Sequence, residues 1–212
     1  MPLEKADRCA LLAYGMMERG SKIILASGSP RRRELLSMIG LEFEIDPGDI
    51  DERHHQGEAP ADYIIRLARA KVIDAVARHA SGLVLGADTT VVVDEEILAK
   101  PEDDQDAMRM LRLLSGRWHE VMTGVAVYDI ETRREAFDYA ETRVRFAGMS
   151  DKEIDWYIST GEHRDKAGAY GIQGRGSLFV EEIEGNYHNI VGLPIRLVHR
   201  LAKRLGYSLM RG

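Results

Sequence analysis

Short apolar runs alternate along the chain with longer stretches whose apolar residues recur at helical spacing. The runs typical of strands lie at residues 22–27, 42–45, 83–85, 91–93, 121–130, 135–146 and 178–183. The stretches typical of helices lie at residues 31–39, 61–80, between Pro101 and Gly116, at 151–158 and at 193–205. Strands interleaved with helices predict an α/β fold, and the strand pair at 121–146 makes the sheet mixed.

Residues that cap helices agree with these boundaries. Gly40 and Gly116 each follow a predicted helix, and "SDKE", which begins at Ser150, is the capping-box pattern of a helix start. The glycine-rich stretch at 161–177 contains few apolar residues, so we expect it to form a loop outside the core. We expect the two halves of the chain to face each other across a cleft.

Composition and charge narrow the class of protein. The 212 residues suffice for one substantial core, and no apolar run approaches the roughly 20 residues that a membrane helix needs. A net charge of −6 argues against stable binding to nucleic acid, which requires a basic surface. Cys9 is the only cysteine, so no internal disulfide forms and a cytoplasmic location is expected. We divide the sequence into an extension at 1–20, which lacks the features of a signal peptide, and one domain at 21–212.

The densest group of cations follows a turn of small residues, "SGSP", after the first strand. Ser29 is suited to cap the next helix and Pro30 to its first position, so free backbone N–H groups and the helix dipole face the turn. The arginines at 31–33 oppose that dipole unless an anion such as phosphate binds there. The alternative is a basic helix face in solvent. The pattern lacks the GxxxxGK[ST] sequence of a P-loop.

A second candidate is Asp88 in "GADTT", residues 86–90. It comes directly after the apolar run at 83–85, so we expect it at the carboxyl end of a strand, where α/β sheets bind ligands. A carboxylate at such a place binds a divalent metal or takes a proton from water. The alternative is a turn aspartate that begins a hairpin into the run at 91–93.

Three further polar features have either a functional or a purely structural interpretation. Lys71 falls between Ile64 and Leu67 on the helical wheel, so it either extends to the rim of the core or points into a polar site. The sequence "DIDE" at 49–52 is either a cation site or a solvated turn. Gln173 offers a donor and an acceptor that suit the edge of a nucleobase, or else it belongs to a mobile surface loop.

The combination of motifs is more specific than any one of them. In order along the chain they are "LASGSPRRRELL", "DIDE", "GADTTV", "LAKP", "LSGRWHEVMTGV", "ETRVRF", "DKAGAYGIQG" and "NYHNIVGLP". Together they resemble the Maf family of nucleoside triphosphate pyrophosphatases over about residues 22–206. The arginine after "SP" and the late "DKAGAYGIQG" resemble the branch that acts on dTTP and UTP. Ala99 departs from the pattern, because glycine is expected before this lysine.

The resemblance implies a fold and a reaction. The fold is a mixed, elongated and twisted sheet flanked by helices, with two lobes around a central nucleotide-binding cleft, as in ITPase-like proteins. The reaction is hydrolysis of dTTP, UTP or modified pyrimidine nucleotides between the α- and β-phosphates, which yields a nucleoside monophosphate and pyrophosphate. Mg²⁺ or Mn²⁺ is the expected cofactor, and a homodimer is the expected assembly.

The resemblance also implies roles for individual residues. Its proton acceptor falls on Asp88, and its other catalytic charges fall on Glu52, Lys71 and Lys100. Asp88 and Glu52 are the expected metal ligands. The residues expected to bind substrate are Ser27, Ser29, Arg31, Arg32, Thr89 and Gln173, and among them Arg31, Thr89 and Gln173 are expected to select the base.

Two other functions stay open on the sequence. One is a regulator of cell division or septum formation that binds a nucleotide without turnover, and the other is a pyrophosphatase for a modified purine nucleotide such as m7GTP. The acidic net charge argues against nucleic acid as the ligand. The set of carboxylates and lysines argues against a passive binder, because binding alone does not need a carboxylate beside a triphosphate.

Overall fold

The structure, a computed structural model, describes residues 22–210, so the extension expected at 1–20 lies outside the described residues. The strands are β1 (Ile23–Leu25), β2 (Glu44–Ile45), β3 (Leu83–Val93), β4 (Glu96–Leu98), β5 (Trp118–Asp129), β6 (Arg134–Phe146) and β7 (Val180–Glu184). The helices are α2 (Pro30–Met38), α3 (Pro60–Val76), α4 (Asp104–Leu114), α5 (Asp151–Ser159), α6 (Tyr187–Val191) and α7 (Ile195–Arg204), with the 3₁₀ helices η1 (Ala167–Ala169) and η2 (Arg175–Phe179). This interleaved order confirms the predicted α/β class.

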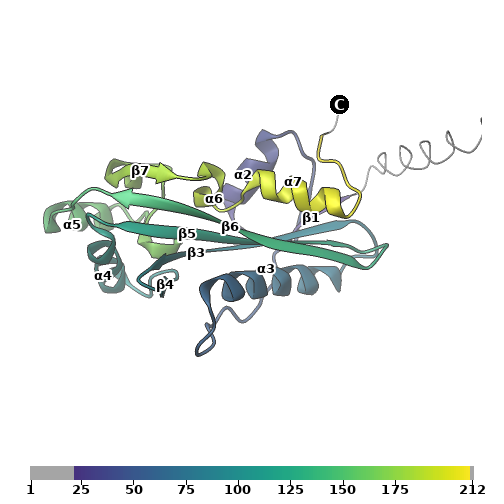
Figure 1. Ribbon diagram of the computed structural model, residues 1–212, viewed down its shortest axis with the longest axis horizontal. Coiled ribbons are helices and arrows are strands. Elements are labelled where there is room, and N and C mark those ends of the chain that lie inside the picture. The colour runs from purple at the N-terminus through teal and green to yellow at the C-terminus, as the bar shows by residue number, and fades with distance from the viewer. Residues whose placement is uncertain (1–21, 211–212) are drawn as a thin grey trace, which may run out of the picture.

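The strands of the described chain form one seven-stranded sheet. Its order is β2-β1-β3-β5-β6-β7, and β4 pairs with β3. β1 is parallel to β2 and to β3, whereas the remaining pairs are antiparallel. The long strands β3, β5 and β6 extend through the elongated molecule, and the sheet twists along them (Figure 1). The prediction of a mixed, elongated and twisted sheet is therefore confirmed.

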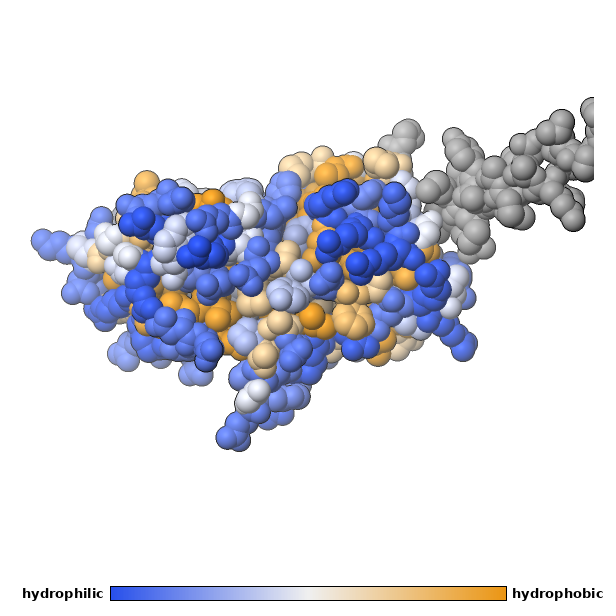
Figure 2. All heavy atoms as spheres, in the orientation of Figure 1, coloured by the Kyte–Doolittle hydropathy of each residue, from blue (hydrophilic) through white to orange (hydrophobic). Residues whose placement is uncertain are grey.

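Helices cover both faces of this sheet. α3 lies on one face, and α2, α6 and α7 lie on the other. α4 and α5 lie at the end of the long strands that is farther from α7 (Figure 1). Side chains alternate along β3, so that Val84 and Val92 pack on the α3 face while Leu85 and Val91 pack on the other. Leu85 belongs to a core with α7 and Val91 to a core with α4, and the strand crosses from one core to the other near its middle. Polar side chains cover both ends of the face in view, with smaller apolar areas between them (Figure 2).

The break predicted at "GADTT" is wrong, because β3 is one continuous strand and Asp88 lies in its middle rather than at a carboxyl end. The sequence becomes more polar at residues 86–90 because β3 has no paired strand there on one of its two sides. β1 pairs with β3 only at residues 83–85 and β4 only at 91–93, whereas β5 pairs at 83–92. Residues 86–90 are therefore bordered by neither β1 nor β4, and we call them the free edge of β3. A free edge accepts polar residues that a fully paired central strand would not.

The glycine-rich stretch gives a second correction. It contributes Ala169, Tyr170 and Ile172 to the core, where none is more than 8% exposed, so it is not a loop outside the core. At Gly168, with φ +66°, a Cβ would lie 2.8 Å from a methyl group of Val91, so glycine lets this backbone press against β3. Few apolar side chains are needed because the backbone itself makes the close contact.

Three smaller differences concern short or terminal segments. β4 and α6 were not predicted, because segments of three and five residues are too short to show a periodicity. α3 ends at Val76, earlier than predicted, and the chain then forms a turn. The capping box at Ser150 is confirmed, since its hydroxyl accepts from the N–H of Glu153 while the Glu153 carboxylate accepts from the N–H of Ser150.

Two glycines bring α3 unusually close to the sheet. A Cβ on Gly86 would lie 2.5 Å from the carbonyl oxygen of Ala68, and a Cβ on Gly124 would lie 2.5 Å from that of Ile64. Gly86 stands two residues before Asp88 in β3, and Gly124 lies opposite Asp88 in β5. The close packing therefore occurs beside Asp88 and fixes the height of α3 above it.

We expect Gly86→Ala to destabilise the protein by about 1–3 kcal/mol, the usual cost of forcing an added carbon into a packed interface. Chemical denaturation measures this loss in the free energy of unfolding. Gly148→Ala is the matched control, because a Cβ there meets nothing within 4 Å and its stability should be unchanged or slightly raised. Equal stability of the two variants would contradict close packing at Gly86.

Candidate active site

The free edge of β3 borders a cavity of about 410 Å³. Its wall includes every residue that the sequence placed in the site, namely Ser27, Ser29, Arg31, Arg32, Glu52, Lys71, Asp88, Thr89, Lys100 and Gln173. These residues come from segments far apart in the sequence, and the fold brings them together because β1 ends where the free edge begins. The roles assigned to them stay predictions.

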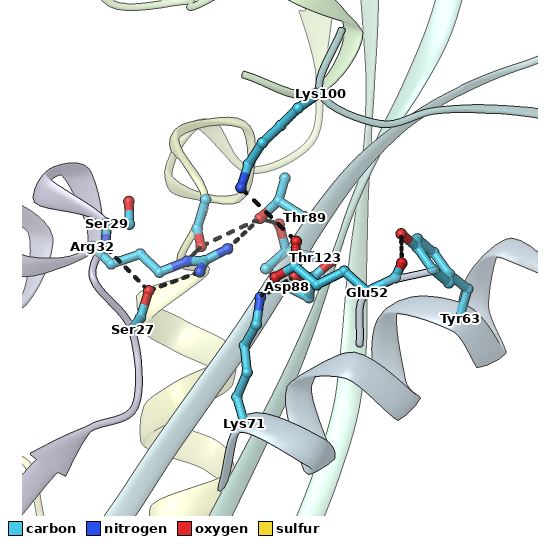
Figure 3. Close-up of polar contacts among 11 residues, drawn as sticks. Ser27, Ser29, Arg32, Glu52, Tyr63, Lys71, Asp88, Thr89, Lys100 and Thr123 are labelled. Atoms are coloured by element: carbon cyan, nitrogen blue, oxygen red, sulfur yellow. Dashed lines mark hydrogen bonds and ion pairs between the residues drawn. The ribbon is translucent and has the colours of Figure 1, made fainter. Parts of the chain in front are cut away.

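On the α3 face of the sheet, one ammonium group lies between two carboxylates. The Lys71 Nζ lies 2.5 Å from Asp88 Oδ1 and 2.7 Å from Glu52 Oε1. The side chains of Lys71 and Asp88 are each 12% exposed, so the pair is largely removed from water. Lys71 thus points into the cleft instead of extending to the rim of the core, which decides between the two interpretations of its position (Figure 3). Lys100 approaches from the other side, with its Nζ 3.9 Å from Glu52 Oε2.

The ionised form of Glu52 is favoured by these cations. Partial burial by itself would raise the pKa of Glu52, but the hydrogen bond and charge of Lys71, with the charges of Lys100 and Arg32, outweigh it and lower the pKa. Tyr63 holds the same segment, because its hydroxyl donates to the Glu52 carbonyl oxygen at 2.9 Å. Burial, together with the negative charges of Asp88 and Glu52, raises the pKa of Tyr63 to about 12, so the phenol remains a donor. This contact could not be predicted from the sequence, since Tyr63 lies on the apolar side of α3 and looks like a core residue.

On the opposite face of the sheet, the guanidinium of Arg32 is buried among neutral acceptors. Its Nε donates to the Gly192 carbonyl oxygen at 2.8 Å, one terminal nitrogen to Ser27 Oγ at 3.0 Å, and the other to Thr89 Oγ1 at 3.1 Å. Arg32 is 8% exposed, and no carboxylate of residues 22–210 forms an ion pair with it. Burial lowers the pKa of Arg32, which the charge of Asp88 partly opposes. Three of its five N–H groups are used, so one on each terminal nitrogen is left, the arrangement that grips a phosphate in a bidentate way.

The remaining residues of the predicted set lie around this arginine. Ser29 occupies the N-cap position of α2 as predicted, but its hydroxyl makes no capping bond, and its N–H donates to Ser27 Oγ at 3.3 Å. Arg31 crosses the cleft to the glycine-rich stretch, where its Nη1 lies 3.1 Å from Asp165 Oδ2. Lys166 holds the other oxygen of Asp165 at 2.5 Å. The turn after β1 and the glycine-rich stretch, which carries Gln173, are thereby joined across the cavity.

Asp88 and Glu52 are the residues suited to a divalent cation. Residues 22–210 contain no cluster of three or more His, Cys, Asp or Glu side chains that could enclose a metal. Asp88 and Glu52 nevertheless converge on one point, now filled by the Lys71 ammonium, and both offer hard oxygen donors. Two carboxylates with the rest of the shell supplied by water and phosphate is the usual pattern for Mg²⁺ bound together with a nucleotide. The donor set therefore fits the expected cofactor, which stays a prediction.

Comparison with known proteins identifies the family. A family model described as Maf-like protein matches residues 22–205. The chain belongs to the Maf family. A protein named dTTP/UTP pyrophosphatase from Geotalea uraniireducens is 51% identical over 191 residues, which are 90% of this chain and 98% of that protein. Proteins of the same name from Anaeromyxobacter dehalogenans and Symbiobacterium thermophilum are 51% and 45% identical, over 89% and 90% of this chain and 96% and 97% of their own lengths.

A solved structure agrees with the fold of this Maf protein. The structure titled Staphylococcus aureus Ham1 protein matches with a TM-score of 0.51 and 12% identity, and covers 87% of this chain and 99% of that one. At this identity the likeness concerns the fold alone. It supports the mixed sheet with flanking helices that the resemblance implied.

A buried histidine anchors the glycine-rich stretch of this Maf protein to β5. His119 is 1% exposed, and its Nε2 lies 2.8 Å from the hydroxyl of Tyr170. The two rings also pack edge to face against each other and against Phe146. Burial lowers the pKa of His119 to about 4. In the sequence this histidine stands out only as part of the motif "LSGRWHEVMTGV", because a lone histidine at an inward strand position does not reveal its partner.

We expect His119 to make the fold sensitive to acid. Above about pH 6.5 the residue is neutral in both the folded and the unfolded chain, so it adds no pH dependence. Below that value the unfolded chain takes up a proton that the folded chain refuses until about pH 4, so stability falls across this range. The loss reaches about 3 kcal/mol.

The measurement is the free energy of unfolding from pH 7.5 to 4.5 for the wild type and for His119→Phe. The variant lacks the buried imidazole, so its stability should fall less steeply on acidification, even if it is less stable at pH 7.5. Parallel curves for the two proteins would show that His119 does not titrate in this way.

Proposed function

We propose that this Maf protein hydrolyses dTTP and UTP to the nucleoside monophosphate and pyrophosphate. The observation that carries the proposal is the charge on the two sides of the free edge. Lys71 with two carboxylates lies on one side, and Arg32, which is buried without a carboxylate, lies on the other. A buried cation without an anionic partner is costly unless a ligand supplies the anion. The names of relatives at 45–51% identity support the choice of substrate.

The two faces of the sheet contribute different groups to the reaction. Arg32 binds the triphosphate through its two remaining N–H groups, while Lys71 and Lys100 stabilise the negative charge that develops on the leaving pyrophosphate. Asp88 accepts a proton from the attacking water, and its hydrogen bond to Lys71 orients the carboxylate. Glu52 shares Lys71 with Asp88 and so fixes the ammonium between them.

A divalent cation, Mg²⁺ or Mn²⁺, would be held by Asp88 and Glu52. When bound, such an ion neutralises phosphate charge and lowers the pKa of a coordinated water.

The base is recognised by Arg31 and Gln173, which line the same cavity as the groups that bind the phosphates. Thymine and uracil each present two carbonyl groups and one N–H. The amide of Gln173 matches one carbonyl and the N–H, and Arg31 donates to the second carbonyl, in exchange for its contact with Asp165. Cytosine carries an amine where uracil has a carbonyl, so an arginine donor would face another donor. An unmatched pair costs about 1–3 kcal/mol, which is roughly 10- to 100-fold in rate.

We also propose a cytoplasmic homodimer. The assembly is inferred from the family and the location from the use of a single cysteine. Within residues 22–210 no helix has the length and hydropathy to cross a membrane.

The function is tested by incubating the protein and Mg²⁺ with dTTP, UTP, dCTP, CTP and m7GTP and measuring the pyrophosphate and monophosphate released. We expect turnover of dTTP and UTP at least about 10-fold above that of the cytidine nucleotides. Asp88→Asn should lower the rate by roughly 100-fold or more, the usual loss on removing a general base. Release of orthophosphate instead of pyrophosphate, faster turnover of m7GTP, or binding of nucleotide without turnover would each contradict the proposal.

The contribution of Gln173 is tested by its removal. Gln173→Ala should lower the rate on UTP more than the rate on CTP, because only the uracil edge is matched to the amide. Leu178→Ala is the control, since this side chain in η2 is 71% exposed and does not line the cavity. An equal loss on UTP and CTP would place Gln173 away from the base.

A further inference from the structure

The hydroxyl of Thr89 is fully engaged on the Arg32 side of the sheet. Its Oγ1 lies 3.1 Å from an Arg32 terminal nitrogen, 3.0 Å from Thr123 Oγ1 and 3.5 Å from the Gly192 carbonyl oxygen. Thr89 and Thr123 are directly opposite each other in β3 and β5. The family resemblance assigns Thr89 to base selection, but in these contacts its hydroxyl oxygen accepts from the arginine (Figure 3).

The protons of the two hydroxyl groups can be assigned in turn. Thr123 is fully buried, and its hydroxyl donates to the Asn189 carbonyl oxygen at 3.1 Å, which uses its only proton. Its oxygen must then accept from Thr89 at 3.0 Å, since the Gly192 carbonyl at 3.5 Å is at the limit of a hydrogen bond. With its proton directed at Thr123, Thr89 presents a lone pair to Arg32, which can only donate.

We propose that Thr123 is a positioning residue for phosphate binding. It orients the Thr89 hydroxyl, and Thr89 in turn holds the guanidinium of Arg32 so that its two remaining N–H groups face the cleft. In this arrangement Thr89 acts on the phosphates through Arg32 rather than on the base. The inference deepens the proposed function and rests on it for the identity of the anion.

The fold itself does not require the Thr123 hydroxyl. The carbonyl oxygen of Asn189 also accepts from the Gly192 N–H at 3.0 Å, so it stays satisfied when the hydroxyl is removed. Without Thr123 Oγ1, the Thr89 proton turns to the Gly192 carbonyl, where it competes with Arg32 Nε. The expected consequence is a loosened arginine in an intact protein.

The test compares Thr123→Val with Thr123→Ser, which keeps the hydroxyl. The probe is inorganic tripolyphosphate, whose binding is measured by calorimetry in the presence of Mg²⁺. We expect Thr123→Val to weaken binding about 3- to 10-fold, the range of one hydrogen bond, and Thr123→Ser to retain the wild-type affinity. The preference for UTP over CTP should be the same in all three proteins, because the base is not read by this pair.

Two controls separate positioning from a general loss of structure. Thr142→Val removes another buried hydroxyl, which bonds to the backbone of Asn186 and accepts from Asn189 Nδ2 at 3.0 Å but contacts neither Thr89 nor Arg32. The Asn189 amide keeps its bond to the Val121 carbonyl oxygen, so this variant should lower the melting temperature without changing the affinity for tripolyphosphate. In an Arg32→Met background, Thr123→Val should have no further effect on that affinity, because its action passes through the arginine.

Several results would overturn the inference. They are unchanged affinity in Thr123→Val, an additive loss in the Arg32→Met background, or an altered ratio of UTP to CTP turnover. The proposed function fails separately, if the wild type hydrolyses no nucleoside triphosphate while Thr123→Val still weakens the binding of tripolyphosphate.

Discussion

The architecture of the site depends on one gap in strand pairing. β3 is paired with β5 on one side along nearly its whole length, but on the other side its pairing with β1 ends at residue 85 and its pairing with β4 begins only at 91. The free edge between them lets a ligand approach a central strand that would otherwise be enclosed. Because neighbouring side chains of a strand point to opposite faces, Asp88 faces α3 and Thr89 faces α2 and α6. One short segment therefore supplies functional groups to both walls of the cleft.

The two walls differ in how their charges are balanced. On one wall Lys71 is compensated by Asp88 and Glu52, and the close packing at Gly86 and Gly124 keeps its helix near the sheet. On the other wall Arg32 has only neutral acceptors. Burying a charge in this way costs stability, and a polyanionic ligand would offset the cost. The imbalance is a physical reason for the cleft to select a phosphate-rich ligand over a neutral one.

The sequence predicted most long elements, and it predicted the members of the site better than their arrangement. Long periodic segments such as α3 and the β5–β6 pair were recognised because many residues contribute to the pattern. The ten predicted residues all line one cavity. They could be identified because the family motifs mark them, whereas spacing alone left the roles of Lys71 and Asp88 undecided. The break at "GADTT" was misread. This polar segment lies inside a strand that has no paired strand on one side, and which strands pair with each other cannot be read from a single sequence. The contacts of Tyr63, His119 and Thr123 were missed for a similar reason, because each joins segments that are distant in the sequence.

The proposed mechanism is tested most directly by a crystal structure of the protein with Mg²⁺ and a dTTP analogue in which an imido group replaces the oxygen between the α- and β-phosphates. The account predicts that the triphosphate lies along residues 86–90, with phosphate oxygens within hydrogen-bond distance of both terminal nitrogens of Arg32 and the α-phosphate near Asp88. A nucleotide bound away from this edge, or one whose phosphates leave Arg32 without a contact, would contradict it.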